Sequence, residues 1–260
     1  MANKKQIRHR RLLSLLETGP NMRVNELADE LEVTAETIRR DLDELSGKGV
    51  VDRTYGGAML KASHEPVVNI RHNLMTRERE GIARAAVKQL YGAKIIMIGS
   101  GATTTHVARR IAIEMNGITV ITHSFGVATV LSLNPTICVM MAPGIYHGTE
   151  GAMHGSQTLR YLDDFHVDWA ITGASGLTAR GASDALIDAG DVYSCMIKHA
   201  SRTMVVADRT KFNKVFTARF AKWSDIDKLV TDERPGPKLS SAVKKADTEI
   251  VVSSSESASS

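Results

Sequence analysis

The sequence is poor in cysteine, proline and aromatic residues. Its 260 residues include two cysteines and six prolines, and aromatic residues make up 5%. Cys138 and Cys195 do not form a CxxC pair, which excludes a disulfide-stapled secreted domain and a zinc ribbon. The apolar runs are far shorter than the ~20 residues of a membrane-spanning helix. No apolar stretch with a cleavage site follows the basic N-terminus. We therefore expect a cytoplasmic protein with no membrane partner.

The N-terminal part of the chain, where an excess of basic residues would indicate an acidic partner, has no excess charge. The net charge is +4, yet residues 1–57 hold ten Lys and Arg against ten Asp and Glu. Placement matters more than the total, because five basic residues precede the first acidic one. They are Lys4, Lys5, Arg8, Arg10 and Arg11. The overall composition, 43% hydrophobic and 24% charged, is that of a folded protein and argues against disorder over most of the chain.

Three stretches of helical periodicity in the first 45 residues predict a helix-turn-helix. The first begins at Lys4 and ends before Gly19-Pro20, the second is about two turns long, and Thr34 is a good N-cap for the third. Two short helices joined by about three residues form this motif. The apolar positions expected to face inward are Ile7, Leu12, Leu15, Leu16, Val24, Leu27, Ala28, Leu31, Ile38, Leu42 and Leu45.

The third helix is the candidate reading element. Burying its apolar stripe turns Glu36 and Arg40 outward and leaves Thr37 and Arg39 on the flanks. The N-terminal part of such a helix enters the major groove of DNA, where Arg can bond guanine edges and phosphates. An alternative stays open, in which Arg40 only pairs with Glu36 or Glu44 on a solvated face.

The residues after this helix favour the DNA-reading interpretation. Gly49 to Gly57 reads as a short β-hairpin, and a hairpin after a helix-turn-helix is a wing whose tip suits the phosphate backbone. The residues predicted to contact DNA are Thr34, Glu36, Thr37, Arg39, Arg40, Arg53, Thr54 and Tyr55.

This part of the chain resembles the DeoR family of bacterial sugar-metabolism regulators. The resemblance is carried by Val33-Thr-Ala-Glu-Thr-Ile-Arg-Arg-Asp-Leu42 and by Arg53-Thr-Tyr-Gly-Gly-Ala58. It implies binding of double-stranded operator DNA through the third helix, usually as a repressor.

Beyond the wing, residues 58–76 lack clear periodicity and are predicted to be a linker. From residue 77 to 252, apolar runs alternate with helical segments, which indicates an α/β domain with a mainly parallel sheet. The predicted strands lie near 94–98, 118–122, 136–141, 167–172, 203–207 and 228–231. The serine-rich residues 253–260 are expected to form a disordered tail.

Ligands of such sheets bind at the carboxyl ends of the strands. After the first strand, Gly99 to Thr105 offers small residues and hydroxyls at a helix N-terminus, a combination that can hold a phosphate or can simply be an N-cap. Asp208 and Lys211 likewise suit ligand contacts. Alternatively, Asp208 is a capping residue after a strand and Lys211 is a solvated surface lysine. The predicted ligand-contacting residues are Ser100, Gly101, Ala102, Thr103, Thr104, Gly173, Ser175, Asp188, Asp208 and Lys211.

The resemblance to the DeoR family extends over residues 3–235. It implies an effector domain similar to ribose-5-phosphate isomerase that binds a phosphorylated sugar or polyol. The chain departs from the family pattern at Gly99, where an acid is usual, at Asp191, where Glu is usual, and at Cys195, where Lys is usual. These departures fall where sugar selectivity is expected.

Three function classes compete. A regulator whose effector changes the spacing of DNA-binding domains in a homo-oligomer, a dimer or a tetramer, agrees best with the motifs. A sugar-phosphate isomerase needs a base, but the Thr172 to Gly176 strand end holds no carboxylate. A purely structural assembly domain is the third. His147, Glu150 and His154 share a loop without HExxH or Cys partners, so we expect neither a metal nor another cofactor.

Overall fold

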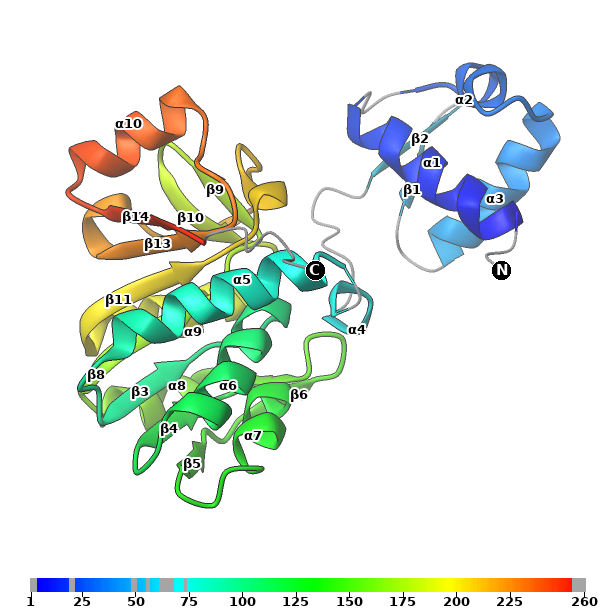
Figure 1. The fold of residues 1–260 in the computed structure, drawn as a ribbon. Helices are drawn as coiled ribbons and strands as arrows, with labels where there is room; N and C mark the ends of the chain where they lie inside the picture. Colours follow the sequence, from blue (N-terminus) through cyan, green and yellow to red (C-terminus); the bar gives the residue numbers. More distant parts are fainter. Residues whose placement is uncertain are drawn as a thin grey trace, which may run out of the picture. The chain divides into compact units, whose positions relative to one another are not determined.

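The chain folds into two compact units, Met1–His64 and Glu65–Ser260 (Figure 1). The computed structural model describes residues 4–18, 22–47, 51–54, 57–60, 68–72 and 74–253. Within these residues, no helix is both long and apolar enough to cross a membrane.

The first unit is a winged helix-turn-helix. Its helices are α1 (Lys4–Thr18), α2 (Val24–Glu30) and α3 (Ala35–Gly47), followed by the antiparallel pair β1 (Val51–Thr54) and β2 (Gly57–Leu60). Thr34 caps α3, since its Oγ1 accepts a hydrogen bond from the Thr37 amide at 3.2 Å. The buried core consists of Leu12, Leu16, Val24, Leu27, Ala28, Leu31, Ile38, Leu42, Leu45 and Val51.

The sequence prediction needs correction in two places. Ile7, expected to face inward, is 47% exposed, because the α1 residues that pack into this core begin at Leu12. The segment predicted as a linker, 58–76, contains most of β2 and the short helix α4 (Val68–Arg71). The first unit therefore extends beyond residue 57, to include the second strand of its wing.

A buried charge that the sequence did not predict lies on α3. Asp41 on α3 is 2% exposed and accepts hydrogen bonds from the Arg8 guanidinium and from His9 Nε2, the latter at 3.0 Å. Burial pushes the pKa of Asp41 up, but the bonds from Arg8 and His9 outweigh it and hold this pKa below its usual value. The ion pair between Arg8 and Asp41 thus holds α1 against α3.

The second unit is a three-layer α/β domain around a seven-stranded parallel sheet. In spatial order the strands are β14 (Glu249–Val252), β13 (Lys228–Thr231), β11 (Ala200–Val206), β8 (Val167–Thr172), β3 (Ile95–Ile98), β4 (Thr119–Thr122) and β5 (Cys138–Met141). All six predicted strands belong to this sheet, which confirms the α/β prediction. Only β14 was missed.

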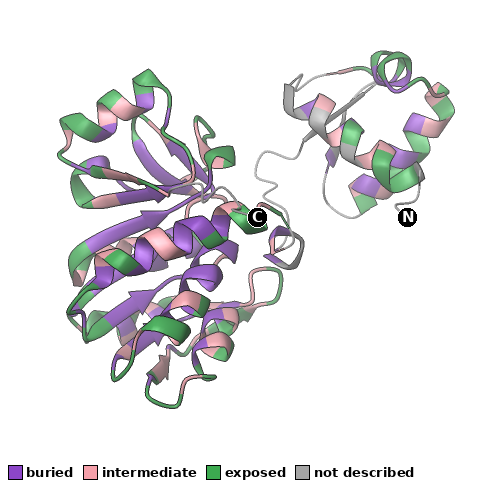
Figure 2. Cartoon of the chain, viewed as in Figure 1, coloured by how far each residue is buried: buried purple, intermediate pink, exposed green. Residues whose placement is uncertain are grey.

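Helices cover both faces of the sheet, because successive strand residues point to opposite sides. Ile96 and Ile98 pack with helices α5 (Thr76–Val87), α6 (Ala102–Glu114) and α7 (Phe125–Leu131). Met97 packs on the other face with α8 (Ser156–Asp163), α9 (Ile187–Lys198) and α10 (Pro237–Lys245). Figure 2 shows the central strands of this sheet buried between helices whose outer surfaces are exposed.

Several shorter elements complete the second unit and were not predicted. They are the hairpin β6 (Ile145–His147) and β7 (Ala152–His154), the antiparallel sheet of β9 (Gly176–Thr178), β10 (Gly181–Asp184) and β12 (Ala218–Ala221), and three short 3-10 helices, Lys88–Leu90, Arg209–Lys211 and Trp223–Asp225. Of the predicted disordered tail, Ser253 donates its amide to Thr231 in the sheet, and residues 254–260 lie outside the described residues.

Replacing Asp41 by Asn should destabilise the first unit by ~2 to 4 kcal/mol, because Arg8 would lose its charged partner in a largely buried site. The wild-type contribution is present above the ordinary Asp pKa of 3.8 and is lost as the pH falls below it toward the lowered folded pKa. Amide hydrogen exchange of the full chain measures it, with the exposed Asp29→Asn on α2 as the matched control. Equal protection in both variants would contradict the assignment.

Candidate functional site

The outward face of α3 carries the predicted base-contacting side chains. The side chains of Arg40, Glu36 and Arg39 are 80%, 61% and 52% exposed. Glu36 lies 3.4 Å from Arg40 and 3.6 Å from Arg39, so the alternative pairing with Glu36 exists as well. Exposed pairs of this kind contribute only a few tenths of a kcal/mol. They leave both guanidinium groups available to a phosphate or a base.

The remaining predicted DNA contacts lie on or near the cap and the wing. Thr34 is exposed and Thr37 half-buried, and their hydroxyls lie 2.9 Å apart at the start of α3. Arg53 and Thr54 end β1, opposite Ala58 and Gly57. Their side chains, and Tyr55 altogether, lie outside the described residues.

A pocket opens at the carboxyl edge of the parallel sheet, between the ends of β3 and β8. Six of the predicted ligand-contacting residues line it, and five other residues complete the wall. The predicted ones are Ser100, Gly101, Ala102, Thr103, Gly173 and Lys211. The others are Arg71, Arg79, Ala174, Asp184 and Tyr193.

The floor of the pocket is the N-terminus of α6. Gly101 has φ 130°, a conformation that favours glycine, and its carbonyl accepts the hydroxyls of Thr104 and Thr105 at 2.9 and 2.8 Å. Thr104, predicted to contact the ligand, is fully buried and does not line the pocket, because its hydroxyl turns back to this carbonyl. The first amides of a helix lack intrahelical acceptors, so they can bind an anion here.

Three cationic side chains, Arg71, Arg79 and Lys211, line the pocket at this helix end. Only Lys211 was predicted from the sequence to contact the ligand. Arg79 is 3% exposed and donates to the backbone oxygens of Arg71 and Leu74, the latter at 2.8 Å. It also pairs with Asp208 at 3.2 Å. Arg79 was missed because its buried position depends on backbone acceptors in the segment predicted as a linker.

Asp208 was predicted to contact the ligand, but the structure places it behind the pocket. It is fully buried, pairs with Arg79 and accepts the Thr210 amide at 3.1 Å, which starts the turn that carries Lys211. Burial raises its pKa, yet the Thr210 bond and the charges of Lys211 and Arg79 outweigh this and keep the pKa below its usual value. The alternative reading of Asp208 as a cap thus agrees with its contacts.

The lining of the pocket also carries one carboxylate. Asp184 on β10 accepts the Ser175 hydroxyl at 3.1 Å and the Leu186 amide at 3.0 Å, so Ser175 supports Asp184 and does not line the pocket. Asp188, the other acid predicted to contact the ligand, is exposed and also lies outside the pocket lining. Antiparallel pairing of β10 with β12, absent from the sequence prediction, sets Asp184 opposite Ala218 and places it here.

The back of the pocket is a rigid hydrogen-bonded cluster. The Tyr193 hydroxyl donates to the Ser100 carbonyl at 2.9 Å and contacts the Ser100 Oγ at 3.0 Å. His123 Nδ1 donates to Met153 O at 2.8 Å, so its Nε2 accepts the Ser100 amide at 3.1 Å. Burial lowers the pKa of His123 to about 4 and keeps the ring neutral. A Cβ at Gly99 would lie 2.7 Å from the Tyr193 ring, so these two positions constrain each other.

Both units match known domains. Residues 8–64 match the DeoR-like helix-turn-helix domain, and residues 74–233 match the DeoR C terminal sensor domain. The chain belongs to the DeoR family. A DeoR-family chain of this organisation is a DNA-binding transcriptional repressor with a sensor domain, and not an enzyme.

Its relatives align over nearly the whole chain. The transcriptional repressor CsqR of Escherichia coli K12 is 31% identical over 94% of both proteins. The glycerol-3-phosphate regulon repressor of the same strain is 29% identical, over 88% of this chain and 91% of its own. The lactose phosphotransferase system repressor of Lactococcus lactis is also 29% identical, over 90% and 93%.

Among solved structures, ribose 5-phosphate isomerase A of Methanocaldococcus jannaschii aligns with a TM-score of 0.40 and 19% identity. The alignment covers 53% of this chain and 55% of that one.

Replacing Arg39 or Arg40 by Ala should weaken binding to operator DNA selected from a randomised pool. The loss of a base contact costs ~1 to 3 kcal/mol, whereas the loss of a phosphate contact mainly lowers the salt dependence. The charge-matched control is Arg180→Ala, an exposed residue of the second unit. Unaltered affinity and salt dependence in both α3 variants would refute the assignment of this face.

Proposed function

We propose that this chain represses a sugar or polyol catabolic operon in the cytoplasm and is released from its operator by a phosphorylated sugar or polyol bound in the sensor-domain pocket. The observation that carries the proposal is the set of three cations, Arg71, Arg79 and Lys211, around the N-terminus of α6. Relatives named for glycerol-3-phosphate and for the lactose phosphotransferase system point to the same effector class.

The phosphoryl group would bind at the floor of the pocket. A dianion there gains the α6 amides, the partial positive charge of the helix end and charge-assisted bonds from Arg79 and Lys211. Because Arg79 is already fixed by two backbone oxygens and Asp208, little side-chain entropy would be lost on binding.

The hydroxyls of the effector would bind to Asp184, beside the small lining residues Gly173 and Ala174. The carboxylate accepts bonds from Ser175 and Leu186, which fixes its orientation toward the pocket. Tyr193 closes the back of the pocket, and its hydroxyl bonds to Ser100. This arrangement supports a short polyol phosphate with at least one hydroxyl near Asp184.

The signal would reach the DNA-binding unit through α4. The Val68 amide donates to Thr149 O at 3.0 Å, and Arg71 pairs with Glu150, so both ends of α4 are held by one loop. Arg71 also lines the pocket, where a bound phosphate competes with Glu150 for its guanidinium. Residues 61–67, which precede α4, join it to the helix-turn-helix. An effector that draws Arg71 away would weaken the hold on the start of the sensor domain.

We also propose a homo-oligomer, a dimer or a tetramer, in which two DNA-binding units read paired half-sites. Two-fold symmetric proteins of this type match palindromic operators. A loosened connection at α4 would then lower the affinity for the operator, because the distance between the DNA-binding units of two subunits would no longer be fixed.

A panel of phosphorylated sugars and polyols should contain compounds that raise the melting temperature of the sensor domain. Lys211→Ala should abolish the shift, because it removes one of the three cations. The control is Lys214→Ala, an exposed lysine in the same loop. If no compound shifts the unfolding of the wild-type protein, the pocket is not an effector site and the assembly-domain alternative gains.

Glu150→Gln should weaken operator binding without effector, because the neutral amide holds Arg71 and α4 less firmly. We expect roughly a fivefold to tenfold loss, or ~1 to 1.4 kcal/mol. Titration of labelled operator DNA measures it, with Glu80→Gln, an exposed residue of α5, as the control. Wild-type operator affinity in the Glu150 variant would rule out this route from pocket to DNA.

A further inference from the structure

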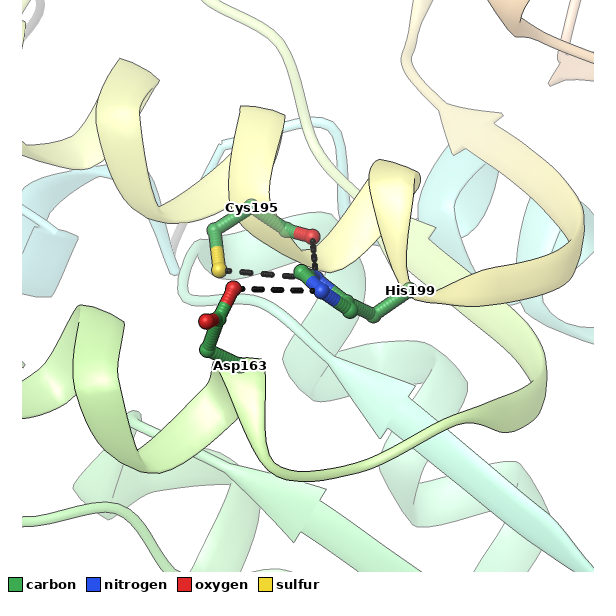
Figure 3. Close-up of side chains that lie close together, drawn as sticks. All are labelled: Asp163, Cys195 and His199. Carbon is green, nitrogen blue, oxygen red and sulfur yellow. Dashed lines mark hydrogen bonds and ion pairs between the residues drawn. The ribbon is translucent and has the colours of Figure 1, made fainter.

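A cluster of three metal-ligating side chains lies away from the effector pocket, between the C-terminal ends of α8 and α9. It consists of Asp163, Cys195 and His199, each with one ligand atom within 4.8 Å of the others (Figure 3). α8 leads into β8 and α9 leads into β11, so this cluster lies at the amino edge of the sheet. The effector pocket lies at the carboxyl edge, and the two sites share no residue.

The hydrogen bonds of His199 fix which ring nitrogen faces the cluster. Nδ1 lies 2.9 Å from the carbonyl oxygen of Cys195, an acceptor, so Nδ1 carries a proton and donates it. Nε2 lies 3.2 Å from Oδ1 of Asp163. Nε2 and Oδ1 are both atoms that can bind a metal ion, and they face each other across this distance.

Cys195 supplies the third ligand atom of the cluster. Its Sγ lies 3.8 Å from Nδ1 of His199, and in Figure 3 the thiol and the Asp163 carboxylate face the same side of that ring. Two ligands of a tetrahedral Zn²⁺, bound at ~2.0 to 2.3 Å, lie roughly 3.3 to 3.8 Å apart. The 3.2 Å between His199 Nε2 and Asp163 Oδ1 lies just below that range, and the ligand atoms of all three residues lie within 4.8 Å of one another. A His that ligates a metal commonly donates its other N–H to a backbone carbonyl, as His199 does.

We propose that Asp163, Cys195 and His199 bind one Zn²⁺-type cation, with a fourth position open to water. Thiolate and imidazole ligands favour Zn²⁺ over Mg²⁺ or Ca²⁺, which prefer oxygen. The side chain of Asp163 is 71% exposed and that of His199 26%, so the ion has an entry path from solvent. Such an ion would join the ends of α8 and α9 and stabilise the face of the sheet that they cover.

Motif search cannot find this site. Cys195 and His199 are four residues apart on one helix, but the third ligand comes from another helix that no spacing rule connects to them. The expectation of no metal site rested on the absence of CxxC and HExxH patterns, and this cluster uses neither.

The test is titration of the untagged, full-length protein with Co²⁺ and then Zn²⁺. We expect one Co²⁺ per chain with a thiolate-to-cobalt charge-transfer band, and displacement of that band by Zn²⁺. Cys195→Ser should abolish the band, and Asp163→Asn should weaken Zn²⁺ binding at least about tenfold. The matched controls are Cys138→Ser, the other cysteine, and Asp164→Asn, the exposed neighbour of Asp163.

The exposed Asp163 variant keeps the test valid if Cys195→Ser fails to fold. A band that persists in Cys195→Ser, or that disappears in Cys138→Ser, would overturn the proposal. So would equal Zn²⁺ affinity in Asp163→Asn and Asp164→Asn, or the absence of stoichiometric binding in the wild type, which would leave His199 and Asp163 as a proton-mediated pair only.

Discussion

The buried ion pair between Arg79 and Asp208 supports most of the sensor site. A buried pair is stable only when further hydrogen bonds satisfy both partners. Arg79 meets this condition through the backbone oxygens of Arg71 and Leu74, and Asp208 through Thr210. The same bonds fix the turn between α4 and α5, the position of a cation in the pocket, and the turn that carries Lys211. One interaction thus connects the entry of the sensor domain to its candidate anion site.

A similar logic holds in the DNA-binding unit, where Asp41 and Arg8 fix α3 against α1 while Arg39 and Arg40 remain on the surface. Neighbouring residues of α3 therefore have different roles, one in stability and two in the predicted DNA contact. Asp41 is buried and structural, and the two arginines before it are exposed. Rigid placement of α3 reduces the conformational entropy lost when it binds a groove. Both units combine a rigid buried ion pair with exposed or pocket-lining cations.

Local pattern determined what could be predicted. The Ile38, Leu42 and Leu45 stripe, the Thr34 cap and six strands follow from periodicity within short windows, and the structure confirms them. Residues whose placement depends on distant partners were missed or misassigned. Arg71 and Arg79 belong to segments without a binding motif. Asp208 and Ser175 resemble ligand-contacting residues in sequence, yet they support Arg79 and Asp184. Asp188 and Asp184 differ only in tertiary position, which no local signal reveals.

We propose that an anion bound in the sensor pocket lowers the affinity of α3 for operator DNA, and that bound operator lowers the affinity of the pocket for the anion. Linkage requires the coupling to be reciprocal. The most direct measurement is the effector's dissociation constant with and without saturating operator DNA, beside the operator's dissociation constant with and without effector. The account predicts that each ligand weakens the other by the same factor, about 5- to 150-fold. An effector that binds free and operator-bound protein equally well would contradict it.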